Sequence, residues 1–211
     1  MVRDAAPLDE KHAALEAKAE ARGRLRDPRL VAILFAIAVL IVTVDQLTKQ
    51  WAINSLSESE ARPFIGDLIT FQLTFNPGAA FGLASGTTWI FTVIAVIVAI
   101  IVIRVASRIR SVPWAVFLGL VLGGAIGNLI DRLFRDPGFP EGHVVDFINY
   151  ANHFIGNVAD IAIVTASIGI ALLAIIGVDV DGTRTHSNDG ESPPGEVSGG
   201  RPRRGRRRAD G

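Results

Sequence analysis

The chain has 211 residues, of which 49% are hydrophobic, and its 21 basic and 21 acidic side chains leave a formal net charge of zero. The apolar residues are gathered in four long uncharged blocks, residues 30–44, 89–103, 112–130 and 161–178. Such blocks have no polar face to meet water, which argues against a soluble domain. The absence of cysteine excludes disulfides, thiol nucleophiles and cysteine metal sites.

The first block follows a charged tail, residues 1–28, and it predicts a membrane-spanning helix. The apolar part of a secretory signal peptide is the alternative. However, the sequence DQLTKQW that comes next is not a small-x-small cleavage site, so a retained span is favoured. Asp45 and Lys49 stand four residues apart, a spacing that allows an ion pair at the end of a helix.

The segment of residues 55–88 is too long for a plain connector. Within it, residues 68–75 (LITFQLTF) alternate apolar and polar side chains, the period of a half-buried strand. This alternation predicts a small β-sheet on the outer membrane surface. The following FNPGAAFG contains Pro77, Gly78 and Gly82, which predict a turn leading into the second span.

The third block carries Gly119, Gly123 and Gly127 at four-residue spacing. This spacing produces one smooth helix face for close packing against another helix. Asp131 is the next position on that face, so its side chain is predicted to point into the bundle. A charge pair of Asp131 with Arg132 at the membrane interface is the alternative.

The fourth block begins after Asn157 and Asp160. Asn157 is predicted to be the N-cap of this helix, with Asp160 at its third position, where a negative charge favours the helix dipole. Residues 179–211 are rich in Gly, Pro, Ser and Arg and are predicted to form a disordered tail. Its run RPRRGRRR favours an anchor beside anionic lipid, with nucleic-acid binding as the alternative.

The distribution of basic residues predicts the topology. Seventeen lie before the first block, between the second and third, or after the fourth, and only four lie in the two remaining loops. Positive residues favour the cytoplasmic side, so both termini are expected in the cytoplasm and the two less basic loops outside. The spans are expected at about residues 29–48, 89–107, 112–131 and 158–178.

Four acids, Asp45, Asp131, Asp146 and Asp160, fall at or just beyond the outer ends of the spans. Charged groups near membrane depth are costly and are candidates for a functional site. Two carboxyl groups close together in a low-dielectric site share one proton, so one can accept a proton from water while the other donates one to a carbonyl oxygen. This predicts aspartic-protease chemistry. No HExxH-like spacing occurs, so no metal or cofactor is expected.

Two other classes of function remain open at this point. Intramembrane acids also serve transporters and proton relays, although those acids are expected near the bilayer midplane, often with internal repeats. In a structural membrane subunit, the aspartates would only pair with cations.

Five motifs, DQLTK, FNPGAAFG, GGAIGNLIDR, VVDFI and NVADIAI, occur in this order over roughly residues 29–178. Together they resemble the bacterial lipoprotein signal peptidases, the type II signal peptidases. The resemblance implies an all-α polytopic membrane protein with four transmembrane helices and a small extracytoplasmic β-sheet, the β-cradle. It also implies an aspartic endopeptidase of the bacterial cytoplasmic membrane, which removes the signal peptide of diacylglyceryl-modified prolipoproteins just before the lipidated cysteine.

The resemblance implies that Asp146 and Asp160 are the catalytic acids. The supporting polar residues that it implies are Asp45, Lys49, Asn76, Gly78, Asn128, Asp131, Arg132 and Asn157. The implied partners are prolipoprotein substrates and membrane lipid, without nucleic acid, and the chain is expected to be a monomer. Gly156 departs from the family pattern, because an aromatic residue is common before the asparagine of the last motif.

Overall fold

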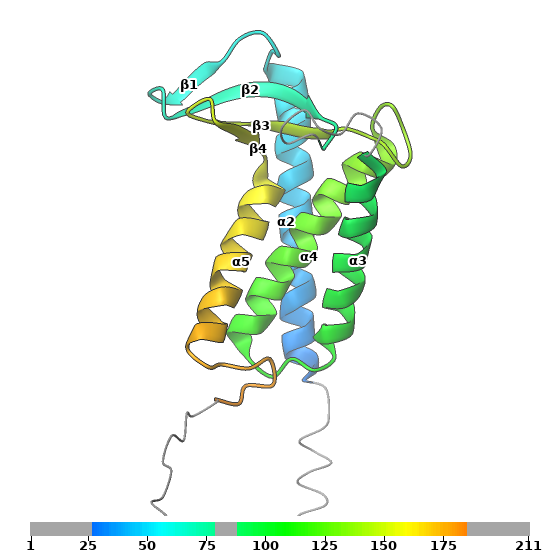
Figure 1. Cartoon of the computed structure of the whole chain (residues 1–211), viewed down its shortest axis with the longest axis vertical. Helices are drawn as coiled ribbons and strands as arrows, with labels where there is room; N and C mark the ends of the chain where they lie inside the picture. The colour runs from blue at the N-terminus through cyan, green and yellow to red at the C-terminus, as the bar shows by residue number, and fades with distance from the viewer. Residues whose placement is uncertain (1–26, 79–87, 185–211) are drawn as a thin grey trace, which may run out of the picture.

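The computed structural model describes residues 27–78 and 88–184 of the chain. Four long helices form a bundle, and one small β-sheet lies over one end of it (Figure 1). The fold class expected from the sequence is therefore confirmed. The tail before residue 27 and the tail after residue 184, with its basic run, lie outside the described residues.

The helices are α2 (Pro28–Ser55), α3 (Thr88–Ala106), α4 (Val112–Phe134) and α5 (Val158–Ile175). Each is long and apolar enough to cross a membrane. At 1.5 Å per residue they are about 27 to 42 Å long, which matches a hydrocarbon layer of roughly 30 Å. Many of their large apolar side chains are exposed, among them Val39, Ile101 and Ile168, as expected for helix faces that meet lipid.

The ends of the helices differ from the ranges expected from hydropathy. α2 continues to Ser55 rather than ending at residue 48, and α4 continues to Phe134 rather than 131, whereas α5 ends at Ile175 rather than 178. The last turns of α2 continue because they pack against the sheet, where Ala52 is buried beside Leu73. Tertiary packing, which hydropathy does not record, therefore extends this helix.

The glycine face of α4 packs closely against α2, as the sequence predicted. A methyl group added at Gly119 would lie 2.8 Å from the carbonyl oxygen of Leu34, and Gly123 is equally close to α2. One added at Gly127 would lie 2.6 Å from Oδ2 of Asp45. These glycines let the two helices approach until polar side chains of α2 reach the surface of α4.

The sheet has the order β1-β2-β3-β4, and all neighbouring strands are antiparallel. Its strands are β1 (Arg62–Ile65), β2 (Ile69–Asn76), β3 (Val144–Tyr150) and β4 (Phe154–Gly156). β2 is the strand predicted from the alternation in residues 68–75. β1, β3 and β4 were not predicted. β3 pairs with β2, and Thr74 lies opposite Asp146, 72 positions further along the chain.

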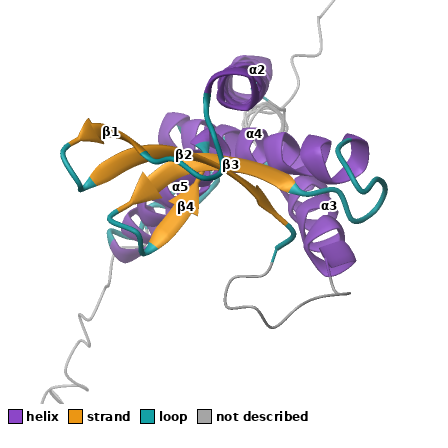
Figure 2. Ribbon diagram, turned by 90° about the horizontal axis from the view of Figure 1, so that it is seen from above, coloured by secondary structure: helices purple, strands orange, loops and turns teal. Residues whose placement is uncertain are grey.

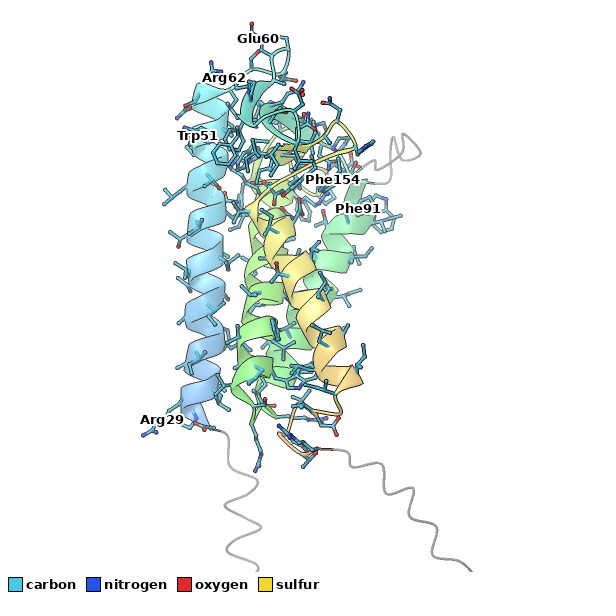
Figure 3. All side chains as sticks on the ribbon, turned by 90° about the vertical axis from the view of Figure 1, so that its left-hand side faces the viewer. Arg29, Trp51, Glu60, Arg62, Phe91 and Phe154 are labelled. Carbon is cyan, nitrogen blue, oxygen red and sulfur yellow. The ribbon has the colours of Figure 1, made fainter. Side chains whose placement is uncertain are left out.

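A small apolar core fastens the sheet to the end of α2. Val145 and Phe147 of β3 are buried against Ala52 and Leu73. Trp51 adds edge-to-face contacts, with its ring centroid 5.5 Å from Phe71 and 6.0 Å from Phe147. Figure 3 shows Trp51 near this end of α2, with Arg29 at the opposite end. The sheet is thus held in a defined position over the bundle.

At the other end of the bundle, residues 179–184 are ordered, which corrects the expectation that the disordered tail begins at residue 179. Val180 accepts a hydrogen bond from the backbone nitrogen of Arg110 at 3.0 Å, and Trp114 donates from Nε1 to the carbonyl oxygen of Val178 at 2.9 Å. Val178 also forms a β-bridge with Arg184. These contacts to α4 and the loop before it hold a segment whose composition alone indicated disorder.

Candidate active site

Asp146 lies in the middle of β3 with only 2% of its surface exposed. Successive side chains of a strand point to opposite faces. Because its neighbours Val145 and Phe147 pack against the end of α2, the carboxyl group of Asp146 lies on the other face of the sheet. There it meets the first turn of α5.

Asp160 lies in that first turn of α5. The prediction of the helix start is confirmed: Asn157 is the N-cap, and its side-chain oxygen accepts a hydrogen bond from the backbone nitrogen of Asp160 at 3.0 Å. In return, Oδ2 of Asp160 accepts one from the backbone nitrogen of Asn157 at 3.1 Å. This capping box fixes the Asp160 carboxylate at the end of a rigid helix.

Asn157 also joins the two acids. Its side-chain nitrogen donates a hydrogen bond of 2.6 Å to Oδ1 of Asp146, while its backbone nitrogen holds Asp160. Asn157 is fully buried. One buried residue therefore places the carboxyl groups of Asp146 and Asp160 next to each other, although they come from a strand and a helix.

Amide groups from two further elements complete the hydrogen bonding of the acids. Asn76, at the end of β2, donates to Oδ2 of Asp146 at 2.8 Å, and its own oxygen accepts from the backbone nitrogen of Gly78 at 2.7 Å. Asn128 of α4 donates to Oδ1 of Asp160 at 2.9 Å. Each of the four carboxyl oxygens thus has an amide donor, so the orientation of both groups is fixed.

The surroundings of Asp146 favour its protonated form. The pKa of Asp146 is raised to about 7, with burial as the largest cause. The negative charge of Asp160 also raises this pKa, while hydrogen bonds from Asn76 and Asn157 lower it. Burial disfavours a charged carboxylate because water no longer solvates it. Asp146 is therefore arranged to hold a proton near neutral pH.

A buried charge cluster lies beside the two acids. The ammonium group of Lys49 lies 2.8 Å from Oδ2 of Asp45 and 2.8 Å from Oδ2 of Asp131, and none of these three side chains is exposed. Arg135 adds a second cation, with Nε 2.6 Å from Oδ1 of Asp131. Two carboxylates and two cations balance in charge, which is required of ions removed from water.

This cluster confirms two predictions and corrects a third. Asp45 and Lys49 do pair, and Asp131 does point into the bundle. The alternative pairing of Asp131 with Arg132 is wrong, since the ion pairs of Asp131 are to Lys49 and Arg135. Adjacent residues on a helix point in directions about 100° apart, so the side chains of Asp131 and Arg132 do not face each other.

The cluster also holds the backbone beside each acid. Oδ1 of Asp45 accepts a hydrogen bond of 3.0 Å from the backbone nitrogen of Ala159, the residue before Asp160. Oδ2 of Asp131 accepts one of 3.2 Å from that of Val145, the residue before Asp146. The charge cluster thus positions α5 and β3 relative to the bundle.

The comparisons with known proteins decide the family. The model of the signal peptidase (SPase) II family matches residues 37–177. The chain belongs to the signal peptidase II family. A lipoprotein signal peptidase of Rhodococcus jostii (strain RHA1) is 47% identical over 152 residues, which are 72% of this chain and 77% of the relative. That of Mycobacterium avium (strain 104) is 42% identical over 74% of this chain and 86% of the relative.

Solved structures agree with this assignment. Two structures described as a bacterial membrane enzyme, studied by the in meso method, are each 28% identical to this chain with a TM-score of 0.60. Each alignment covers 67% of this chain, and 87% and 92% of the two solved chains. The fold is therefore shared with bacterial membrane enzymes of known structure.

In this signal peptidase II family member, a cavity of about 370 Å³ opens beside Asp160 between α3, α4 and α5; we call it the inner cavity. Its polar lining consists of Asn76, Gly78, Asn128, Arg132 and Asp160. Its apolar lining, which includes Ile94, Val98 and Val121, continues down the helices. The inner cavity therefore joins Asp160 to an apolar space between the membrane-spanning helices.

Arg132 contributes a buried cation to the inner cavity. It is 7% exposed, its guanidinium carbon lies 5.3 Å from the centre of the Phe91 ring, and its Nη1 has no hydrogen-bond partner among the described residues. Figure 3 shows Phe91 near the sheet end of the bundle. A buried guanidinium that keeps a free donor is poised to donate a hydrogen bond to an oxygen of a bound ligand.

Gly78 allows this close arrangement. Its φ is +96°, a conformation that side chains disfavour, and a methyl group there would lie 2.5 Å from Cδ2 of Phe91 and 3.3 Å from Nη2 of Arg132. The turn predicted at FNPGAAFG is therefore present as far as Gly78. Its remaining residues, 79–87, lie outside the described residues.

Sequence reasoning missed two residues of the site. Gln46 donates from Nε2 to Oδ2 of Asp45 at 3.2 Å, to Oδ1 of Asp131 at 3.3 Å and to the carbonyl oxygen of Gly127 at 3.1 Å. Arg135 was counted only for topology. Its position four residues after Asp131 was a usable signal, since Asp45 and Lys49 have the same spacing.

Proposed function

We propose that this member of the signal peptidase II family is an aspartic endopeptidase. Its substrates are prolipoproteins that carry diacylglycerol on a cysteine, and it cleaves the peptide bond just before that cysteine. The observation that carries the proposal is the pair Asp146 and Asp160, which Asn157 joins and of which Asp160 lines the inner cavity.

The reaction needs one proton shared between the two acids. Asp160 as carboxylate takes a proton from a water molecule, whose oxygen attacks the carbonyl carbon of the scissile bond, while protonated Asp146 donates to the carbonyl oxygen. In the tetrahedral intermediate, the cysteine nitrogen receives the proton held by Asp160. The bond between carbon and nitrogen then breaks and the amine leaves. One hydroxyl of the intermediate returns its proton to Asp146, which leaves a carboxylic acid product and restores both acids. The raised pKa of Asp146 supports its assignment as the initial acid.

Asn76, Asn128 and Asn157 orient the carboxyl oxygens, and neutral amides do so without neutralising the charge that the reaction requires. Lys49, Asp45 and Asp131 act further away, by holding Asn128 and the backbone beside each acid. The free donor of Arg132 fits an oxygen of the substrate, either a backbone carbonyl or an ester carbonyl of its lipid.

The distribution of charge supports a location in the bacterial cytoplasmic membrane with both termini in the cytoplasm. With that topology, the sheet and the acids lie at the outer face, where a prolipoprotein presents its cleavage site. The acids lie at the sheet end of the bundle and not midway along the helices, which favours a peptidase over a transporter.

The test is cleavage of a lipidated prolipoprotein by the detergent-purified protein, followed as release of the signal peptide. Wild type and the Asp67→Asn variant, which changes an exposed acid, should cleave. Asp146→Asn and Asp160→Asn should not, while retaining the wild-type fold and substrate binding. Cleavage by either site variant at the wild-type rate would refute the aspartic mechanism. Inactivity of the wild-type protein would refute the assignment of lipidated prolipoproteins as its substrates.

A further inference from the structure

Asp160 is reached from two sides of α5. Besides the inner cavity, it lines a second hollow of about 380 Å³, which we call the α5 groove. The α5 groove is lined by Tyr150 and Phe154 of the β3–β4 hairpin and by Asp160, Ile161, Val164 and Thr165 of α5. Figure 3 shows Phe154 at the level of the sheet, and Figure 2 shows β4 over α5.

The geometry of the helix separates the two hollows. At about 100° per residue, Ile163 lies about 60° to one side of Asp160 and Val164 about 40° to the other. Ile163 lines the inner cavity and Val164 lines the α5 groove. In the view from above, α3 and α5 lie on opposite sides of α4, so the inner cavity lies on the α3 side (Figure 2). Asp160 therefore stands on the boundary between the two.

The linings of the two hollows differ in chemistry. The inner cavity contains the buried guanidinium of Arg132 and the amides of Asn76 and Asn128. The α5 groove offers mainly apolar side chains and aromatic rings, and Val164 and Ile161 are 57% and 45% exposed on the membrane-facing side of α5. The ring of Phe154 stacks on Tyr150 at 5.9 Å and forms the upper wall of the groove.

The inference that follows rests on the proposed function. A lipidated prolipoprotein carries two apolar parts on either side of the scissile bond, the apolar segment of the signal peptide and the diacylglyceryl group. Both must stay at membrane depth, since moving each CH₂ into water costs about 0.8 kcal/mol. The ester oxygens of the lipid can accept hydrogen bonds, whereas the apolar side chains of the signal segment cannot.

We infer that the α5 groove is the binding site for the apolar segment of the signal peptide, and that the inner cavity takes the diacylglyceryl group. The scissile bond then crosses α5 above Asp160, between the two hollows. Gly156 fits this path: a methyl group there would lie 3.0 Å from Oδ2 of Asp160 and 2.7 Å from the Phe154 ring, so a side chain would crowd the crossing.

The direct test places a photoreactive amino acid in the enzyme at Val164, at Ile94 of the inner cavity, or at Leu172, an exposed position further along α5. Each protein is mixed with a lipidated prolipoprotein and irradiated, and mass spectrometry identifies the part of the substrate that is captured. The Val164 position should capture the signal segment and the Ile94 position the lipidated cysteine, with neither preference at Leu172. The reverse pattern, or capture of the same part at both positions, would overturn the inference.

A kinetic test uses Val164→Trp to fill the groove, with Leu172→Trp as the matched control. Filling the groove should lower kcat/KM by about tenfold to a hundredfold, the contribution of one buried side chain of leucine size, and the control should leave it unchanged. An unchanged kcat/KM in Val164→Trp would also overturn the inference. Crosslinking does not require cleavage of the substrate. Inactivity of the wild-type enzyme would therefore refute the proposed function, while the crosslinks would still show which part of the substrate binds in the α5 groove.

Discussion

The ammonium group of Lys49 donates a hydrogen bond of 3.0 Å to Oδ1 of Asn128. An ammonium has no acceptor, so the amide oxygen of Asn128 must face it, and the amide nitrogen is turned toward Asp160. A charge on α2 thereby determines which end of a side chain on α4 meets the carboxylate on α5. The buried charge cluster and the two acids form one hydrogen-bonded system.

Replacing Lys49 should therefore weaken the fold. Lys49→Met leaves Asp45 and Asp131 facing each other without this cation, and removing one member of a buried ion pair costs about 3 to 5 kcal/mol. Thermal unfolding of the detergent-purified protein measures the change, with Arg62→Met on the exposed strand β1 as the control. Adding Asp131→Asn to Lys49→Met should recover part of the loss. Equal melting temperatures for Lys49→Met and its control would contradict the prediction.

Substitution of Asp146, Asp160 or Asp131 by asparagine should affect turnover and stability differently. At equal abundance in the membrane, Asp146→Asn and Asp160→Asn should lose at least about a hundredfold in turnover, the contribution of a general acid or base. Asp131→Asn should retain measurable turnover and lose stability, because it holds Lys49 and the backbone of Val145. Retained activity in Asp146→Asn with loss in Asp131→Asn would mean that the pair is Asp131 with Asp160.

The raised pKa of Asp146 predicts how activity depends on pH. The proton that it donates is lost as pH rises through about 7, so kcat/KM should fall above that pH. The profile of kcat/KM against pH measures the fall. Tyr150→Phe is the control, because burial and then Asp160 also raise the pKa of Tyr150. The fall should remain in this variant if Asp146 causes it. A profile that stays flat to about pH 9 would count against Asp146 as the acid.

The raised pKa of Asp146 also predicts the pH dependence of stability. An aspartate in the unfolded chain ionises near its ordinary pKa of 3.8, so between about pH 4 and 7 the folded state binds more protons than the unfolded state. The contribution of Asp146 to the free energy of unfolding is therefore lost as pH rises through this window. Melting temperatures of wild type should fall more steeply from about pH 4 to 7 than those of Asp146→Asn. Parallel curves would show that Asp146 is ionised in the folded state.

The turn after β2 should control access of the substrate. Gly78→Val forces a side chain against Phe91 and Arg132, so it should reduce cleavage of lipidated substrate by about tenfold or more, the contribution of one apolar contact. Ala79→Trp, the next position in the sequence and outside the described residues, is expected to have the same effect. Gly66→Val is a suitable control, because Gly66 also has a positive φ, of 51°, but nothing lies near its added carbon. Unchanged cleavage by the Gly78 and Ala79 variants would remove this turn from the entrance.

The topology has its own test. A reporter inserted within residues 57–62, before the first strand of the sheet, should be active on the outer side of the membrane, because the neighbouring loop is poor in basic residues. A reporter fused after residue 208 provides the cytoplasmic control. Cytoplasmic activity of the first reporter would invert the layout and place the acids at the inner face.

The sequence by itself determined the four apolar helices, the packing face of α4, the strand β2 and the cap of α5. These features depend on hydropathy, on side-chain periodicity and on residues within a few positions of each other, as in the hydrogen bonds between Asn157 and Asp160. Only the tertiary structure decided that Asp146 lies in a strand paired with β2, that Lys49 joins Asp45 to Asp131, and that Asp160 borders two hollows. Strand pairing and buried ion pairing join residues that lie far apart in the chain. Which residues pair depends on which backbone groups and charges still lack a partner once the helices have packed.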